Sequence, residues 1–452
     1  MTYFRGVRTE GIEPIIVSGG DFLYADSDYK ANQVQRGQLR EKAKLIIEAY
    51  NRYPYDAACV AECDLALGLE SLLELKKLCK FPLLCANLVH AESKQLYFQP
   101  SVIVQRGAGA PRVGVIGLMP SLRAEYLARV APESELLPLD VTLRAEIDRL
   151  KNDVDMLVLL AHLERDEVDR VADAFPELDV LLEPNSYSGS TSLWVKDDVQ
   201  VTERNGALVL KLSGQGSHVG RLDFSLGENG EPWQIIESTD SAHAKPRSAE
   251  PPSSEPQTAD TPASGEPTPI AAAPSVNRYR STATALAPYI GSDPTFEAMS
   301  EAFRKSTRFV SLAQPTDFVP SDRYRTAETC KACHEEQYQF WLGTAHGRAY
   351  ATLEKTGDEF RYDCMPCHVV GYGETFIDAH KVGEFKNVQC EACHGTNPKH
   401  PEAPAEHRWR KADGKLIEEK NCWGCHNPMV TKASFNPAEA IPQVSCPPIK
   451  RN

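Results

Sequence analysis

The chain has no apolar run long enough to cross a membrane and no excess of positive charge. A membrane-spanning helix needs about 20 consecutive apolar residues, and the 452-residue sequence contains no such run. Its first residues, Met1–Arg5, are not a basic start followed by an apolar stretch, as in a signal peptide. The net charge of −14 argues against nucleic acid and anionic membranes as partners. With 42% hydrophobic residues, the length allows two or three domains.

A five-residue motif, C-x-x-C-H, occurs four times near the C-terminus. The motifs are Cys330–His334, Cys364–His368, Cys390–His394 and Cys422–His426. This motif is the attachment signal for c-type haem. Two thiols add to the vinyl groups of the porphyrin, and the adjoining histidine supplies the proximal ligand of the iron. We therefore predict four covalently attached haem c groups. The attachment residues would be Cys330, Cys333, Cys364, Cys367, Cys390, Cys393, Cys422 and Cys425, and the proximal ligands His334, His368, His394 and His426.

Two other kinds of site also use C-x-x-C pairs. Four pairs could bind two structural zinc ions, but zinc does not require a histidine directly after every second cysteine. Redox-active dithiols would not need four copies. Haem attachment is therefore the favoured interpretation, and zinc is its alternative.

The other cysteines are Cys59, Cys63, Cys79, Cys85 and Cys446. In an oxidising compartment the four N-terminal thiols could pair, although free buried cysteines fit the sequence equally well. The haem motif itself implies export, because covalent haem attachment takes place outside the bacterial cytoplasm. We expect a periplasmic or extracellular protein. The missing signal peptide would then mean that the numbering begins after processing or that the gene start is placed too late.

The composition predicts a multidomain chain. Residues 1–240 alternate apolar strand-like runs with helical patterns, which is typical of a layered α/β domain. Residues 241–290 are rich in Pro, Ser and Ala and predict a flexible linker. Residues 291–325 predict a helical neck that begins at Asp293-Pro294 and that either returns to the first domain or leads onward. Residues 326–452 predict a mainly helical, loop-rich tetrahaem domain.

Several landmarks follow one another along the first segment. They are Gly20-Asp21, Tyr55–Gly68, Phe81–Asn87, Leu160–His162 and Gly216–Asp223. In this order they resemble 5′-nucleotidase-type metallophosphatases over most of residues 12–226. The resemblance implies a four-layer α/β/β/α sandwich, truncated at its N-terminus. In that family two metal ions activate water against a phosphate ester.

The metal-binding motifs of that family are incomplete in this chain. Its first Asp-x-His pair has no counterpart, its Gly-Asn-His-Glu motif reads Ala-Glu-Cys-Asp at 61–64, and its Gly-His-x-His motif reads Pro-Asn-Ser-Tyr at 184–187. The residues that we assign to a vestigial site are Asp21, Glu62, Asn87 and His162. One aspartate and one histidine cannot hold two ions about 3.5–4 Å apart. We expect hydrolase activity to be lost and no metal in this domain, although Glu62 and Cys63 could in principle bind a different single ion.

The C-terminal segment contains four histidines outside the motifs, namely His346, His380, His400 and His407. Their number would allow a second imidazole ligand for every haem. Trp341–Ala349, which reads W-x-x-T-x-H-x-x-A, and Val388–Gly395 followed by His400 are similar to the cytochrome c-554 family of multihaem cytochromes. This resemblance spans roughly residues 328–430. It implies His346 and His400 as distal ligands and leaves His380 and His407 open.

The sequence therefore predicts an electron-transferring tetrahaem cytochrome with a metallophosphatase-like domain as scaffold or docking module. Its partners would be redox proteins or other cytochromes. Two alternatives remain open at this stage. One is a haem oxidoreductase in which one open iron acts on a small nitrogen or oxygen species. The other is an active nucleotidase or phosphoesterase with a redox tail.

Overall fold

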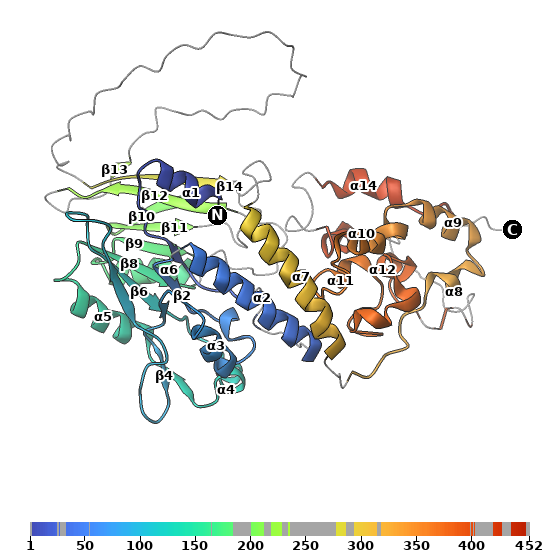
Figure 1. Ribbon diagram of the computed structural model, residues 1–452, viewed down its shortest axis with the longest axis horizontal. Coiled ribbons are helices and arrows are strands. Elements are labelled where there is room, and N and C mark those ends of the chain that lie inside the picture. The colour runs from blue at the N-terminus through green and yellow to red at the C-terminus, as the bar shows by residue number, and fades with distance from the viewer. Residues whose placement is uncertain are drawn as a thin grey trace, which may run out of the picture.

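A computed structural model of the chain describes residues 2–24, 27, 33–53, 55–163, 165–183, 200–211, 218–227, 234–235, 277–285, 293–313, 318–397, 399–400, 402, 419–426 and 435–448. Figure 1 shows an α/β part that contains the N-terminal half of the chain and a helical part that contains the C-terminal third, with helix α7 between them. The chain is therefore multidomain, as predicted. Among the described helices, none has both the length and the apolar character that a membrane span requires.

The largest sheet has the strand order β10-β11-β9-β8-β6-β5. Its strands are β5 (Ser101–Val104), β6 (Val113–Leu118), β8 (Met156–Ala161), β9 (Val180–Glu183), β10 (Gln200–Arg204) and β11 (Ala207–Lys211). The central strands β6, β8, β9 and β11 pair in parallel, whereas β5 and β10 add antiparallel edges. Every residue of β6 is buried, as expected for a parallel strand that is covered on both faces.

Three smaller sheets complete this part. The parallel sheet β1-β2-β3 contains β1 (Val17–Ser18), β2 (Ala57–Cys59) and β3 (Leu83–Leu84). The pair β4-β7 contains β4 (Leu88–His90) and β7 (Ser134–Leu136), and the sheet β12-β14-β13 contains β12 (His218–Ser225), β14 (Arg278–Ala285) and β13 (Gln234–Ile235). The helices are α1 (Thr2–Thr9), α2 (Gln33–Arg52), α3 (Leu69–Lys76), α4 (Ala124–Val130), α5 (Leu139–Leu150) and α6 (Arg165–Ala174).

Alternate residues of the inner strands face different cores, because side chains along a strand alternate between its two faces. Ala57 and Cys59 of β2 pack against Val115 of β6, so one core lies between the two sheets. Ala58 of β2 faces the core that contains α2 and α3. Ile116 of β6 faces the core that contains α5 and α6. The resulting order of helix, sheet, sheet and helix is the predicted four-layer sandwich.

Strand β14 corrects the predicted linker. Residues 278–285 pair antiparallel with all eight residues of β12, from Ser225↔Arg278 to His218↔Ala285. Tyr279 of β14 is buried in the core between the sheets. The flexible segment predicted over residues 241–290 therefore does not include β14, and the remainder of that segment lies outside the described residues. The Pro- and Ser-rich composition concealed the alternating pattern of Arg278–Ala285.

Helix α7 (Pro294–Ala313) lies on the side of the sandwich that faces the helical part (Figure 1). It packs along α2. The neck therefore returns to the first domain, which is one of the two courses that the sequence left open. Asp293 caps its first turn, because its Oδ1 atom accepts a hydrogen bond from the Thr295 amide at 2.9 Å. The other oxygen of Asp293 binds the Arg5 guanidinium of α1 at 2.6 Å. The start of α7 is thus attached to the sandwich.

The chain after residue 318 is built from short helices in its described residues. They are α8 (Ala327–Lys331), α9 (Glu335–Gly343), α10 (Ala349–Thr356), α11 (Met365–His368), α12 (Cys390–His394), α13 (Glu419–Trp423) and α14 (Pro437–Val444). Single 3₁₀ turns occur at His346–Arg348, Ala379–Lys381 and Gly383–Phe385. One small apolar cluster lies around Tyr350, Met365 and Phe376. Met365 is fully buried there.

Candidate haem-binding and vestigial metal sites

Each C-x-x-C-H motif spans about one helical turn. The third motif is helix α12, and the second consists of Cys364 and helix α11. Residues i, i+3 and i+4 lie on one face of an α-helix. The local fold therefore presents both thiols and the imidazole of a motif on the same side, as attachment to a planar porphyrin requires.

Two imidazole pairs lie opposite one another. The ring centroids of His334 and His400 are 6.1 Å apart with an interplanar angle of 17°, and those of His346 and His426 are 5.9 Å apart at 54°. A bond of about 2 Å from a metal to each ring nitrogen would place two trans imidazoles about 6 Å apart, centroid to centroid. Burial lowers the pKa of His334, His346 and His426. The neutral imidazole that binds a metal is thereby favoured.

The second and third of the predicted proximal ligands, His368 and His394, have different surroundings. The Nδ1 atom of His368 lies 2.7 Å from the carbonyl oxygen of Ala349. A hydrogen bond from Nδ1 to a backbone carbonyl orients a histidine so that Nε2 is free to bind a metal. Among the described residues, no imidazole faces His368 or His394 as closely as in the two pairs above.

Among the described residues, His380 is not brought into such a pair. His380 lies against Phe360, with 4.6 Å between the ring centroids. His407 lies outside the described residues. Both therefore stay predictions.

Contacts between thiols arrange the four motifs in a series. Cys330 of the first motif lies beside Cys390 of the third, close enough for the two thiols to shift each other's pKa. Cys393 of the third motif lies close enough to Cys422 of the fourth for burial and that neighbour to raise its pKa to about 11. Cys425 of the fourth motif lies beside Cys367 of the second, again close enough for the two thiols to shift each other's pKa. The spatial order is therefore first, third, fourth, second. All thirteen cysteines lie in described residues, and none of them forms a disulfide.

Buried polar side chains fasten the first motif to the third. Gln389, which precedes the third motif, accepts a hydrogen bond from the amide of Ala327 in α8. Glu391, inside the third motif, accepts one from the amide of Arg325 at 2.6 Å. Trp341 of α9 donates its indole N–H to the carbonyl of Val388 at 2.7 Å. These bonds define the spacing between the two motifs without a conventional apolar core.

In the sandwich, two of the vestigial residues meet where β1 and β8 end. Asp21 follows β1 and His162 follows β8, and the Oδ2 and Nδ1 atoms of the two lie 3.3 Å apart. The other oxygen of Asp21 accepts a hydrogen bond from the amide of Cys63 at 2.7 Å. The preceding Gly20 has a φ of +113°, and a Cβ atom there would lie 2.7 Å from that of Ala61. Glycine is thus required for the close approach of these loops.

Asp64 holds the same loops together and was missed as a site residue in the sequence. Its carboxylate accepts hydrogen bonds from the amides of Asp21, Leu23 and Ala61, at 3.1, 3.0 and 3.0 Å. Burial, together with the nearby Asp21 charge, raises the pKa of Asp64 to about 8. This carboxyl group occupies the last position of the altered Ala-Glu-Cys-Asp motif. Its contacts are structural, because all three join backbone amides of these loops.

The described residues do not fit a pair of metal ions. Asn87 is buried, and both polar atoms of its amide bond to the backbone of Met119, at 2.8 and 2.9 Å. Glu62 contributes its backbone carbonyl to the hydroxyl of Tyr126 at 2.8 Å. Within the described part of the chain, no group of three or more His, Cys, Asp or Glu side chains could hold a metal ion. The segment 184–187 lies outside it.

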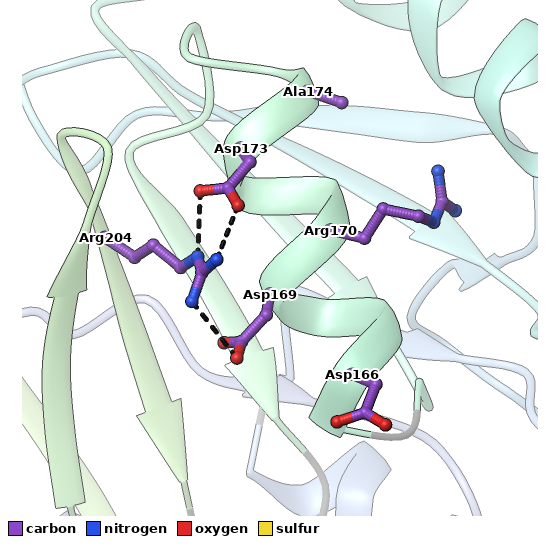
Figure 2. A pocket seen from close by; sticks show the side chains of 6 residues that line it. All are labelled: Asp166, Asp169, Arg170, Asp173, Ala174 and Arg204. Carbon is purple, nitrogen blue, oxygen red and sulfur yellow. Dashed lines mark hydrogen bonds and ion pairs between the residues drawn. The ribbon is translucent and has the colours of Figure 1, made fainter.

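A shallow surface depression of about 530 Å³ lies on α6 (Figure 2) and is separate from both sites. Arg204 of β10 binds Asp173 through two hydrogen bonds and Asp169 at 3.1 Å. Arg170 pairs with Asp140 at 2.8 Å. Arg204 thus pairs with two of the three aspartates that line the depression, which has the character of a helix surface held by ion pairs.

Comparison with known proteins finds a match in the C-terminal part. Residues 329–395 match the family described as cytochrome c554 and c-prime. The matched stretch contains the first three motifs and His346. The resemblance predicted from these residues is confirmed, and haem c is the cofactor that the family implies.

The N-terminal part resembles nucleotidases and related phosphoesterases, again as predicted. The chain is 25% identical over 169 residues to a 2′,3′-cyclic-nucleotide 2′-phosphodiesterase/3′-nucleotidase of Haemophilus influenzae, which is 35% of this chain and 25% of that enzyme. This chain thus spans a quarter of the length of that relative.

Two solved structures are also similar. The 5′-nucleotidase precursor of Thermus thermophilus has a TM-score of 0.46 at 17% identity, with 69% of this chain and 53% of the other covered. The calcineurin-like phosphoesterase YfkN of Bacillus subtilis has a TM-score of 0.45 at 16% identity, with 68% and 89% covered.

Proposed function

We propose that this protein is an exported tetrahaem c-type cytochrome that transfers electrons to and from redox proteins or other cytochromes. Two pairs of facing imidazoles support this most strongly. They are His334 with His400 and His346 with His426. Each pair joins a predicted proximal ligand to a predicted distal one. When bound, haem c supplies an iron centre that exchanges one electron.

The protein ligands of each iron would then determine whether it transfers electrons or binds a substrate. Two imidazoles per iron leave no position for a substrate, which favours electron transfer over catalysis. Imidazole as the sixth ligand also gives a lower potential than the thioether of methionine. His368, whose Nδ1 atom is held by Ala349, would present Nε2 to its iron. The series of motifs would allow an electron to pass between neighbouring sites.

We further propose that the sandwich has lost hydrolase activity and acts as a scaffold. Asp21 and His162 are too few to hold two ions, Asn87 is bound to Met119, and Asp64 is bound to three amides. The test is the metal content of the purified protein after haem iron is subtracted, together with hydrolysis of a phosphodiester such as bis(p-nitrophenyl) phosphate. Stoichiometric metal with hydrolysis that a chelator abolishes would overturn this proposal.

A second candidate function is supported by one observation. Among the described residues, no imidazole faces His368 or His394 as closely as in the two pairs, so an iron with an open position would fit there. In that case the protein would be a haem oxidoreductase that acts on a small nitrogen or oxygen species.

A pyridine haemochrome assay and an electron paramagnetic resonance spectrum of the oxidised protein separate these candidates. Four haems per chain with low-spin signals alone support an electron carrier. Four haems with one high-spin signal support the oxidoreductase. Absence of haem would overturn both and favour zinc.

A further inference from the structure

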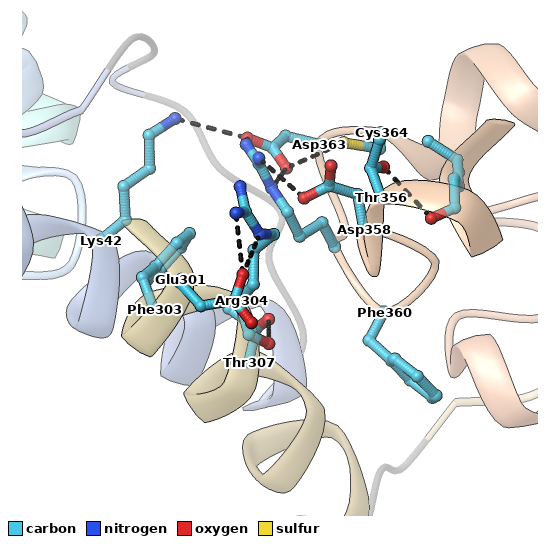
Figure 3. Close-up of polar contacts among 12 residues, drawn as sticks. Lys42, Glu301, Phe303, Arg304, Thr307, Thr356, Asp358, Phe360, Asp363 and Cys364 are labelled. Atoms are coloured by element: carbon cyan, nitrogen blue, oxygen red, sulfur yellow. Dashed lines mark hydrogen bonds and ion pairs between the residues drawn. The ribbon is translucent and has the colours of Figure 1, made fainter. Parts of the chain in front are cut away.

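The segment Asp358–Cys364 joins the two parts of the molecule and leads directly into the second haem motif. Figure 3 shows it facing α2 and α7 of the sandwich. The thiol contacts place the second motif at one end of the series of four. The sandwich therefore touches the helical part next to a terminal haem site.

Gln38 of α2 makes the central contact. It is 1% exposed, and its Nε2 atom donates to the carbonyl of Phe360 at 2.6 Å. Its Oε1 atom accepts from the amide of Tyr362 at 3.0 Å. The Tyr362 side chain packs against the core that contains α2 and α3. One amide side chain thus satisfies two backbone groups of the segment, which would otherwise lose their partners at a cost of about 1–3 kcal/mol each.

Charged groups surround the same segment. Arg361 binds Asp363 at 3.0 and 2.8 Å, and Lys42 of α2 lies 3.5 Å from the second oxygen of Asp363. Asp363 in turn lies 3.8 Å from the Sγ atom of Cys364, the first attachment thiol of the second motif. A positive charge of the sandwich therefore reaches the immediate surroundings of that motif.

Phe360 extends the contact toward a histidine of the helical part. Its ring lies 4.6 Å from that of His380, a predicted distal ligand. The guanidinium of Arg308 on α7 lies 5.0 Å from the centroid of the same Phe360 ring. The backbone that Gln38 holds is therefore connected to Cys364 at one end and to His380 through the ring of Phe360.

We propose that Gln38 is a positioning residue for the second haem site and that Lys42 adjusts its potential. This inference rests on the proposed function. Gln38 holds the segment 360–362, which places Cys364 and the ring that supports His380. Lys42 offsets the charge of Asp363 beside the haem, and a nearby positive charge favours the reduced state. The nucleotidase-like sandwich thus regulates a terminal site of the electron path through a direct contact.

The test uses the full-length chain with Gln38→Leu, Lys42→Ala and the control Lys44→Ala. Lys44 lies on the same helix and pairs with Glu41 of that helix at 2.7 Å. Haem content, low-spin resonance signals and the four midpoint potentials are measured for each protein. We expect four haems throughout. Gln38→Leu should change one resonance signal and one potential, Lys42→Ala should lower the potential of the same haem, and Lys44→Ala should change neither.

Two results would overturn the inference. One is a folded Gln38→Leu variant in which all four signals and potentials match the wild type. The other is an equal effect of Lys42→Ala and Lys44→Ala, which also decides the question if Gln38→Leu does not fold. Absence of haem from the wild-type protein is a different result, because it would overturn the proposed function itself.

Discussion

The two parts of the molecule form their interiors in different ways. The described residues of the sandwich form three apolar clusters, two made of sheet and helix side chains and one that lies between the sheets. The described residues of the helical part contain one small cluster. Ordering the backbone costs about 1–2 kcal/mol per residue. We infer that the helical part depends on attached haem for its stability, whereas the sandwich depends on its own side chains.

Loss of one attachment thiol is expected to have the largest effect. Cys393→Ala should weaken attachment of the third haem and destabilise the helical part, because the third motif contacts both the first and the fourth. The sandwich should remain folded. Intact mass and limited proteolysis measure both outcomes. Cys446→Ala is the control, because this exposed cysteine lies outside the motifs. Full protease resistance of the helical part in Cys393→Ala would contradict the inference that this part depends on attached haem for its stability.

Removing a buried side chain tests whether the stability of the sandwich depends on its own apolar core. Ile116 is fully buried between β6 and the helices α5 and α6. Ile116→Ala should lower the free energy of unfolding of the sandwich by about 2–5 kcal/mol, with the haem content unchanged. Ile103→Ala, at a position that is 44% exposed on β5, should have an effect of about 0.5 kcal/mol or less. Denaturant unfolding followed by circular dichroism measures both values.

Removal of a single distal imidazole should affect one haem and leave the fold intact. His346→Ala should convert one haem to high spin while all four stay attached, because His426 would lose the ring that faces it at 5.9 Å. Optical and paramagnetic resonance spectra report the change. His90→Ala in the sandwich is the control. An unchanged spectrum of His346→Ala would remove this residue from the set of ligands.

The smallest effect that we predict is a pH dependence of the sandwich. Burial raises the pKa of Asp64 to about 8 from its ordinary value of 3.8. The protonated form is thus favoured in the folded state, and its contribution to stability is complete below about pH 4 and lost as the pH rises through about 8. Asp64→Asn should flatten this slope. Denaturant unfolding as a function of pH measures it, and an equal slope in both proteins would contradict the assignment.

Long apolar patterns could be interpreted from the sequence alone. The apolar runs at 112–118 and 155–160 form β6 and β8, and the helix expected after Asp293 is α7. These elements have the regular spacing that burial imposes on a strand or helix. Strand β14 was missed because its residues lie beside a compositionally biased segment, and β3 is too short to form a pattern.

Some residues of the functional site could also be predicted from the sequence, and others could not. The motifs identify Cys330–His334 and its three repeats, because a covalent chemistry requires a fixed spacing. Pairing of His334 with His400 and of His346 with His426 depends on how separate segments fold together, so the resemblance could name candidates but not their partners. Gln38 carries no local signal at all, since a glutamine within a helix is ordinary until the opposite backbone is known. Assignment of the haem ligands stays a prediction until it is measured.

The eight-residue pairing of β12 with β14 has a consequence for the topology of the chain. The Pro- and Ser-rich stretch begins and ends in the same sandwich, so it is an insertion within one fold and does not connect two folds. A single protease cut between residues 236 and 276 would leave two polypeptides that stay associated through this strand pair and through the packing of α7 on α2. All four haem motifs would then lie on the second polypeptide and would remain attached to the sandwich without a continuous chain.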